Sequence, residues 1–339
     1  MATTIYDVAK LAGVGLGTVS RVLNNSPAVR DSTRQRVQAA IRQLDYTPDP
    51  IARSMTRGRT GTLAVIIPFF TRPFSIEVLR GIEASTSRLG FELVVYNIEN
   101  DAQRDDCFRR LPMSRKADGL LVVSVSPKDV FIPNFAQAQL PTILVDAYNP
   151  SITSVVVNNV DGSYAAMKYL LEKGHRRIGF INGQIEGNFK FNQANDRLIG
   201  VHRALGEAGI NFEPELMEIG SWDRQGGRLA SQRLLNLKNP PTAIFAASDV
   251  QALGTLETAK AMKLSVPRDL SIMGFDGIEL SEWLELTTMQ QPMYHMGELG
   301  MALLMEQIEN PQKPPELIRL NTELVERSTI GSPKIRNEQ

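Results

Sequence analysis

Four polar side chains occur where short apolar runs, which have the pattern of buried strands, come to an end. In open α/β sheets, ligands bind beyond the carboxyl ends of the strands. An ionised carboxylate there can accept hydrogen bonds from neighbouring hydroxyl groups, which is how such sites hold polyols and sugars. The four residues are Ser124, Asp146, Ser248 and Asp276, which follow residues 120–123, 143–145, 244–247 and 272–275.

Each of these side chains could instead cap the helix that follows its strand. Ser248 and Asp249 come directly before a helical pattern, and for them capping is favoured. Asp276 is followed by Gly277, so ligand binding is favoured there. For Asp146 the two roles are evenly weighted.

A cation and several aromatic side chains could complete the same site. Arg197 is expected in the first turn of a helix, where its charge opposes the helix dipole and a ligand oxygen or a carboxylate would compensate it. A plain surface arginine is the alternative. Trp222 lies in a predicted loop and could stack on a sugar ring or pack in the core, whereas core packing is favoured for Trp283. Three further aromatic residues could line the opening or fill the edge of a lobe: Phe69, Phe70 and Phe74.

The N-terminal stretch predicts a different chemistry, the reading of DNA. An apolar stripe at helical spacing follows a capping-box pattern of Thr4 and Asp7, and glycines at 13 and 15 end this first helix. Val19 and Val22 begin a second stripe. Such a helix pair can lay its second helix in a major groove, where an arginine pairs with guanine. The residues expected to point away from the bundle are Leu16, Gly17, Ser20, Arg21 and Asn24.

The alternative for this stretch is a helical hairpin with a solvated outer face. A third predicted helix, residues 31–44, closes a three-helix core and favours the DNA-binding interpretation. The glycines at 13, 15 and 17 resemble a dinucleotide-binding loop, but that loop must follow a strand and here it follows a helix.

Residues 48–60 predict a linker, because two prolines end the helical part and a short basic segment follows. Residues 51–58 could form a conditional helix on DNA, although a solvated linker is favoured on chemistry alone. Met55 is an exposed apolar residue among arginines, which suits a minor-groove wedge.

From Leu63 onward, continuous apolar runs alternate with amphipathic stretches, a pattern that predicts parallel strands covered on both faces by helices. The runs are too many for one sheet and a second series starts near Ile178, so two similar lobes with a cleft are expected. The predicted strands contain residues 63–67, 93–95, 120–123, 143–145, 178–181, 244–245 and 272–275, with helices such as 75–89 and 162–173 between them.

Composition supports a globular chain that binds a polyanion at one end. The 339 residues are 42% hydrophobic and carry no net charge. Residues 1–60 hold nine Lys and Arg against four Asp, a charge of +5, and the remaining 28 basic and 33 acidic residues give −5. A single cysteine excludes an internal disulfide. No signal peptide or membrane-spanning run is found, so a cytoplasmic, nucleoid-associated protein is expected.

Catalytic and metal-binding patterns are absent from the sequence. The three histidines lack metal-ligand spacing, Cys107 has no evident base, and neither a nucleophile elbow nor a phosphate loop occurs. We therefore expect no enzyme, no metal and no cofactor.

The motifs resemble those of the lactose/galactose repressor (LacI/GalR) family of bacterial transcription regulators over nearly the whole chain. The N-terminal match is Tyr-Asp-Val-Ala-Lys-Leu-Ala-Gly-Val at 6–14, followed by Thr-Val-Ser-Arg-Val-Leu-Asn at 18–24. Ala-Arg-Ser-Met at 52–55 resembles the family's hinge helix, and Gly-His-Arg-Arg-Ile at 174–178 resembles a turn of its core. Further matches occur at 248–249, 274–276, 287–288 and 326–329.

The resemblance implies a helix-turn-helix headpiece and a two-lobed core like periplasmic sugar-binding proteins. The implied domains are the headpiece at 1–47, the hinge helix or linker at 48–60 and the core at 61–339. Within the core, the N-lobe covers about 61–160 and 291–322, and the C-lobe covers about 161–290 and 323–334.

A homodimer that binds a pseudo-palindromic operator is also implied, with a small sugar-type effector between the lobes controlling operator affinity. The match at Trp222 favours a carbohydrate over a purine. The expected DNA contacts are Thr4, Tyr6, Leu16, Gly17, Thr18, Ser20, Arg21, Asn24, Arg53 and Met55. The expected effector contacts are Phe74, Ser124, Asp146, Arg197, Trp222, Ser248, Asp276 and Gln291.

The chain departs from the family pattern at five residues. Gly15 and Arg30 replace serines and so remove helix caps, and Gly17 offers no side chain to a base. Met55 replaces a leucine, and Gly277 replaces a common second aspartate, which weakens inference about the sugar.

The function predicted is a repressor of sugar-utilisation genes, with induction and corepression both open. The rival readings are a transporter's solute-binding protein, which would not need a basic head, and a sugar-processing enzyme.

Overall fold

The computed structural model describes residues 3–23, 26–46, 60–184, 189 and 191–334. They divide into two compact units, Met1–Thr60 and Gly61–Gln339, and each is described by itself. The predicted DNA contacts Asn24, Arg53 and Met55 lie outside the described residues, as does the predicted hinge helix.

The first unit is a bundle of α1 (Ile5–Ala12), α2 (Leu16–Leu23) and α3 (Asp31–Gln43). The predicted capping box is confirmed, because the Asp7 carboxylate accepts hydrogen bonds from the backbone N–H and the hydroxyl of Thr4 at 2.9 and 2.7 Å. Gly13 ends α1 at φ 62°, a left-handed conformation that glycine adopts without strain. Arg30 precedes α3 without a side-chain cap, as its departure from serine predicts. The predicted stripes form the core, which is made of Val8, Ala9, Ala12, Val19, Val22, Val29, Val37 and Ala40.

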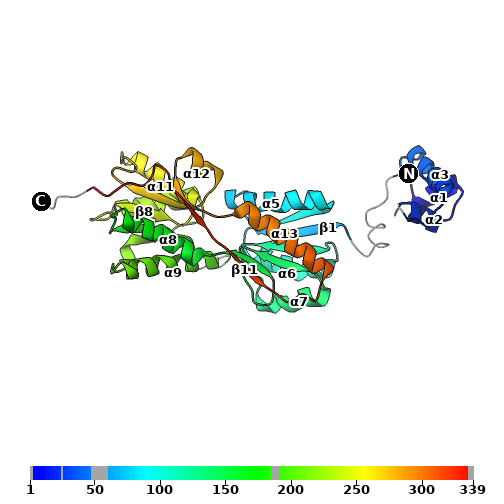
Figure 1. The fold of residues 1–339 in the computed structure, drawn as a ribbon, viewed down its shortest axis with the longest axis horizontal. Coiled ribbons are helices and arrows are strands. Elements are labelled where there is room, and N and C mark those ends of the chain that lie inside the picture. Colours follow the sequence, from blue (N-terminus) through cyan, green and yellow to red (C-terminus); the bar gives the residue numbers. More distant parts are fainter. Residues whose placement is uncertain (1–2, 24–25, 47–59, 185–188, 190, 335–339) are drawn as a thin grey trace. The chain divides into compact units, whose positions relative to one another are not determined.

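The second unit contains two six-stranded sheets, with strand orders β11-β5-β4-β3-β1-β2 and β12-β10-β9-β8-β6-β7. Neighbouring strands are parallel except β12, which runs antiparallel to β10. We call the first sheet with its helices the N-lobe and the second sheet with its helices the C-lobe. The described architecture is thus the predicted one, a helical headpiece and a core of two largely parallel α/β sheets (Figure 1).

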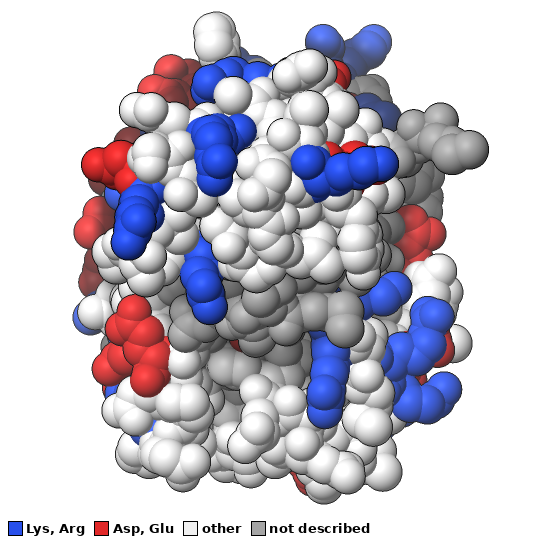
Figure 2. Space-filling view, turned by 90° about the vertical axis from the view of Figure 1, so that its right-hand side faces the viewer, with Lys and Arg blue, Asp and Glu red and all other residues white. Residues whose placement is uncertain are grey.

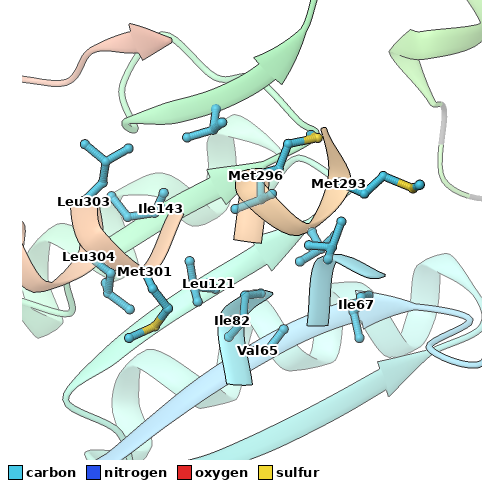
Figure 3. Packing of buried hydrophobic residues seen from close by; sticks show 14 of the residues in the cluster. Val65, Ile67, Ile82, Leu121, Ile143, Met293, Met296, Met301, Leu303 and Leu304 are labelled. Carbon is cyan, nitrogen blue, oxygen red and sulfur yellow. The ribbon is translucent and has the colours of Figure 1, made fainter. Parts of the chain in front are cut away.

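In the N-lobe, α5 (Pro73–Leu89) and α13 (Met293–Glu309) cover one face of the sheet, and α6 (Asp101–Ser114) and α7 (Ile132–Ala138) cover the other. Figure 3 shows methionine and leucine side chains of α13 packed over the strands. The strands are β1 (Thr62–Pro68), β2 (Glu92–Ile98), β3 (Gly119–Val123), β4 (Thr142–Val145), β5 (Ser154–Val157) and β11 (Leu317–Leu320).

In the C-lobe, α8 (Asn159–Glu172) and α9 (Asn192–Glu207) cover one face, and α10 (Arg224–Leu235) and α11 (Asp249–Ala261) cover the other. The short helix α12 (Glu279–Trp283) follows the central strand β9. The strands are β6 (Ile178–Asn182), β7 (Met217–Ile219), β8 (Ala243–Ala246), β9 (Ser271–Asp276), β10 (Thr287–Gln290) and β12 (Glu323–Val325).

The chain crosses between the lobes three times through short connections. It passes from β5 to α8, from β10 to α13 and from β11 to β12. The last crossing leaves only residues 321–322 between strands of different sheets. All three connections lie outside the strands of both sheets.

Helices α5 and α13 pack backbone against backbone through two glycines. A Cβ atom built on Gly81 would lie 2.0 Å from the carbonyl oxygen of Tyr294, and one built on Gly297 would lie 2.2 Å from that of Val78. Real Cβ atoms do not approach backbone atoms this closely. Only glycine fits at these two positions.

The structure contains every strand that the apolar runs predict, with one correction. Leu93, Val94 and Val95 do belong to a strand, but β2 is an edge strand, and Val94 and Val95 are exposed rather than covered on both faces. Five strands were not predicted: β5, β7, β10, β11 and β12. The two predicted helices begin two or three residues earlier than expected, at Pro73 and Asn159.

Candidate functional site

A pocket in the second unit lies between the lobes, beyond the carboxyl ends of strands from both sheets. The centre of a water molecule can reach a volume of about 90 Å³ inside this pocket. Since one water needs roughly 10–15 Å³ by this measure, the pocket has room for about seven waters or a small organic molecule. All eight residues predicted to contact an effector line it: Phe74, Ser124, Asp146, Arg197, Trp222, Ser248, Asp276 and Gln291.

Four of the ten described non-glycine residues with a positive φ line this pocket. Phe69, Ser124 and Asp146 have φ angles of 46°, 59° and 58°, and Asp276 has a φ of 128°. Such backbone conformations cost free energy in residues other than glycine, and they recur at binding and catalytic sites. Strain at four residues that line one pocket therefore supports this pocket as the functional site.

Asp146 forms a hydrogen-bonded bridge between the lobes. Its carboxylate accepts hydrogen bonds from the Ser124 hydroxyl at 2.8 Å and from the side-chain amide of Gln193 at 2.7 Å. The same amide also donates to the Asp146 backbone carbonyl. Burial raises the pKa of Asp146 to about 6, against the lowering effect of Ser124 and Arg197. Because Gln193 belongs to the C-lobe and Asp146 to the N-lobe, this contact ties the two lobes together at the pocket.

Arg197 is the buried cation of the site. It is the sixth residue of α9, so the prediction that it lies in the first turn was wrong, because the helix starts at Asn192. Its Nε donates to the Asn159 side chain at 2.8 Å, and its Nη1 donates to the Ala247 carbonyl. Nη2 lies 3.9 Å from the Asp276 carboxylate, a distance at the limit of an ion pair. Burial lowers the pKa of Arg197, which the nearby carboxylates partly offset.

Asp276 and Asp249 are buried carboxylates with different roles. Asp276 lines the pocket and accepts a hydrogen bond from the Gln291 amide at 2.7 Å. Burial raises the pKa of both groups, to about 8 for Asp276 and about 6 for Asp249, and the negative charge of Asp249 adds to the effect on Asp276. Asp249 faces away from the pocket and accepts hydrogen bonds from the Thr288 hydroxyl and from the N–H groups of Gly277 and Ile278.

The capping prediction therefore holds for only one of the two residues at the start of α11, Ser248 and Asp249. Ser248 is the N-cap, and its hydroxyl accepts from the Gln251 N–H at 3.2 Å. The prediction that Asp249 caps the helix was wrong. Its carboxylate accepts hydrogen bonds from the segment after β9 and so supports the turn that contains Asp276. Gly277 in that turn has a φ of 74°, so the aspartate usual in the family would be strained here.

Trp222 forms one wall of the pocket from the predicted loop between β7 and α10. Its ring lies 5.5 Å from the Arg197 guanidinium and edge-to-face with Phe191 at 6.2 Å between centroids. Of the three phenylalanines after the first strand, Phe69 and Phe74 line the pocket and Phe70 does not. The favoured core role of Trp283 was wrong, because its side chain is 79% exposed on α12.

Several residues of the pocket were not predicted from the sequence. Gln193 lies one helical turn before Arg197, and this spacing of four on one helix was the only local signal for it. Arg72 stacks on Phe69 at 3.9 Å, and no pattern pointed to it. Phe191 and Val250 also line the pocket.

Gly183 provides the space in which the Trp222 ring lies. A Cβ atom on Gly183 would stand 1.9 Å from a ring carbon of Trp222. We expect Gly183→Ala to displace the indole from the pocket wall and to weaken binding of any ligand stacked on it by about fivefold, since such stacking contributes on the order of 1 kcal/mol beyond burial. Calorimetric titration and the tryptophan emission of the variant check this. Unchanged emission and affinity would show that the indole keeps its place.

The outer surface of the first unit has the properties predicted for DNA contact. Leu16, Gly17 and Arg21 are exposed on α2, and Thr18 and Ser20 are half-buried beside them. Tyr6 and Thr4 are exposed at the start of α1. Most basic side chains of residues 3–23 and 26–46 are exposed, as contact with phosphates requires; they are Lys10, Arg21, Arg30, Arg36 and Arg42. Figure 2 marks the Lys and Arg and the Asp and Glu side chains that are visible in one view.

Other types of site were also sought in the described part of the chain. There, no group of three His, Cys, Asp or Glu side chains is placed to hold a metal ion. No helix in those residues is long and apolar enough to span a membrane.

A helical DNA-binding unit followed by a two-lobed α/β core with a pocket between its lobes defines the class of ligand-responsive transcription regulators. Residues 4–49 match the bacterial regulatory proteins of the lacI family, and residues 167–330 match the periplasmic binding protein-like domain. The HTH-type transcriptional repressor CytR of Escherichia coli (strain K12) is 37% identical over 314 residues, which cover 91% of this chain and 90% of that relative. The chain therefore belongs to the lacI family of bacterial regulatory proteins, whose members regulate transcription and are not enzymes.

Solved structures agree with this assignment. The lac repressor dimer bound to its operator and the anti-inducer ONPF superposes with a TM-score of 0.87 at 26% identity, covering 98% of this chain and 100% of that one. The transcriptional regulator CelR in complex with cellobiose gives a TM-score of 0.71 at 29% identity, covering 96% and 99%.

Proposed function

We propose that this protein is an operator-binding repressor whose affinity for DNA is controlled by a small carbohydrate-type effector bound between the lobes. The observation that carries the proposal is the pocket, where a strained Asp146 and Asp276 from different lobes face one arginine and an aromatic wall. Carboxylates and an arginine suit hydroxyl groups, and aromatic rings suit the faces of a sugar ring. The likeness to a regulator in complex with cellobiose supports the same class of ligand.

The proposed mechanism couples the pocket to DNA through the angle between the lobes. A ligand that binds both lobes changes this angle at the three short crossings and so moves the segment that leads to the first unit. Residues 51–58 would then fold, or fail to fold, in the minor groove, with Arg53 and Met55 in contact with DNA. A coupling of about 1–3 kcal/mol changes operator affinity roughly 5- to 150-fold. A calorimetric sugar screen, followed by operator titration with each sugar that binds, tests the proposal and decides between induction and corepression.

Arg21 is the side chain best placed to read a base, because it is exposed on the outer face of α2. We expect Arg21→Ala to lose about 1–3 kcal/mol at one base pair of each half-site and to leave nonspecific binding nearly unchanged. Titrations on operator, single-substituted operators and random duplex at one salt concentration measure this. Arg36→Ala, which removes an exposed arginine of α3, is the matched control. Equal losses on operator and random duplex would assign Arg21 to the phosphates instead.

We further propose a homodimer on a pseudo-palindromic operator. The resembling lac repressor was solved as a dimer on its operator. In this chain Trp283 and Leu280, which are 79% and 42% exposed on α12, provide apolar surface for a second copy. A sedimentation mass of one chain, 37.6 kDa, at operator-binding concentrations would contradict this. Such a repressor acts where the DNA is, in the cytoplasm at the nucleoid.

A further inference from the structure

Phe189 belongs to the C-lobe by its place in the chain, but its side chain is buried in the core of the N-lobe. It lies between β6 and α9, which are both parts of the C-lobe. Only 2% of the side chain is exposed, and it is a member of an apolar cluster whose other buried residues all come from positions 64–152. Its ring packs edge-to-face on that of Phe69, with 5.8 Å between the centroids. One side chain of the C-lobe therefore fills a place in the core of the other lobe.

The backbone of Phe189 makes a second contact with the N-lobe. Its N–H donates to Oδ1 of Asp101, the first residue of α6, at 2.9 Å. The guanidinium of Arg104 lies 2.8 Å from the same oxygen and holds the carboxylate in place. Phe189 has a φ angle of 55°, which costs free energy in a residue other than glycine. Burial of the ring and the hydrogen bond to Asp101 offset that cost, and both come from the N-lobe.

These contacts lie at the opposite edge of the N-lobe sheet from two of the crossings between the lobes. The strand order of this sheet is β11-β5-β4-β3-β1-β2. The chain crosses to the C-lobe after β5 and after β11, at one edge, whereas Phe69 follows β1 and Asp101 follows β2, at the other edge. When one lobe rotates about segments at one edge, the far edge moves most. The contacts of Phe189 must therefore break when the lobes open.

Phe189 also stands apart from the polar groups of the pocket. The described residues that line the pocket include Phe69 and Phe191 but not Phe189. Phe191 packs on the Phe189 ring at 5.9 Å and on the Trp222 ring at 6.2 Å between centroids. Phe189 thus joins the lobes beside the pocket through contacts that need no ligand.

We propose that Phe189 is an inter-lobe anchor, a positioning residue that holds the lobes closed around the pocket before any effector binds. Opening the lobes exposes its ring to water and breaks the hydrogen bond from its N–H to Asp101. Burial of a phenyl ring shifts an equilibrium by about tenfold or more, so this side chain sets how often the lobes of the free protein open. The proposal depends neither on the identity of the effector nor on DNA binding.

Hydrogen exchange of the full-length protein without added ligand tests the proposal. The amide of residue 189 reports opening directly, because it donates across the lobes to Asp101. After correction for the intrinsic rate of each sequence, we expect Phe189→Ala to speed its exchange about tenfold or more, since exchange follows the population of the open form.

Phe135→Ala is the matched control. It removes a buried phenyl ring of the same apolar cluster, but from α7 within the N-lobe. It should lower the thermal midpoint of the protein and leave the exchange of residue 189 unchanged, because Phe135 does not join the lobes.

The emission of Trp222 gives a second readout. The chain has two tryptophans, so a Trp283→Phe background leaves Trp222 in the pocket wall as the single reporter. We expect acrylamide to quench Trp222 more strongly once Phe189→Ala is added to this background, and no more strongly once Phe135→Ala is added, because only the first change opens the pocket to solvent.

Two results would overturn the proposal. Equal rises in exchange and quenching for Phe189→Ala and Phe135→Ala would show that lost core packing, rather than a contact between lobes, is the cause. Unchanged exchange and quenching in Phe189→Ala would show that the lobes stay closed without the ring. If Phe189→Ala does not fold, Phe189→Leu takes its place with a smaller rise expected, and the absence of any rise then overturns the proposal.

Discussion

Asp276→Asn should abolish the response to effector while operator affinity stays unchanged. The carboxyl group lies in the pocket with one oxygen free for a ligand hydroxyl, and the loss of such a buried hydrogen bond costs roughly 1–3 kcal/mol, or about 5- to 150-fold in affinity. Operator titration with and without the sugar found by calorimetry measures the effect. Glu279→Gln, which neutralises an exposed carboxylate three residues away, is the matched control and should respond as the wild type does. A full response from Asp276→Asn would remove Asp276 from the site.

The same substitution should make the core more stable at alkaline pH. Burial raises the pKa of Asp276 to about 8, above the value of roughly 3.9 in an unfolded chain. The folded state therefore binds more protons than the unfolded state between these values, and the stability that Asp276 contributes is complete below pH 4 and lost as the pH rises through about 8. We expect the thermal midpoint of Asp276→Asn to exceed that of the wild type at pH 9 by more than it does at pH 5. A constant difference between the two proteins would contradict the raised pKa.

Gly297→Ala should destabilise the core by about 3 kcal/mol or more. The added methyl group would stand 2.2 Å from the carbonyl oxygen of Val78, and neither backbone can move without separating α5 from α13. Overpacking commonly costs 1–3 kcal/mol, and contact with backbone places this case at the upper end. Urea unfolding followed by circular dichroism measures the loss.

Gly206→Ala is the matched control for that prediction. Gly206 lies in α9, where a Cβ atom meets nothing within 4 Å. Replacing glycine by alanine in an open helical position should raise stability by about 0.5–1 kcal/mol. If both variants lost the same stability, helix propensity rather than the contact between α5 and α13 would be the cause.

The sequence predicts those parts of the fold whose signals are local. The stripes of the first unit and the glycine after α1 depend on residues three or four apart, and they occur as predicted. The central strands are continuous apolar runs and were found, with β1 as an example. Edge strands such as β11 and β12 are short and partly exposed, so their pairing depends on the rest of the sheet and leaves little trace in the sequence.

The sequence predicts those site residues that directly follow a strand. Asp146 and Asp276 follow from the rule that ligands bind at the carboxyl ends of parallel strands. Gln193 was missed because its partner Asp146 is 47 residues away in the other lobe, and only the meeting of the lobes brings them together. Trp283 was misplaced because an apolar residue on a short helix is buried or exposed according to distant elements, and here none covers it among the described residues.

The late position of β11 and β12 has a consequence for protein synthesis. A ribosome completes the three helices of the first unit by residue 43, but each sheet lacks an edge strand until residues 317–325 emerge. Domains fold as units during translation, so the N-terminal unit is ready long before the lobes are complete. A chain that stalls before Leu317 would carry a finished DNA-binding head on an unfinished sensor. Such fragments would carry the helices that are proposed to contact DNA without the completed sheets that form the pocket.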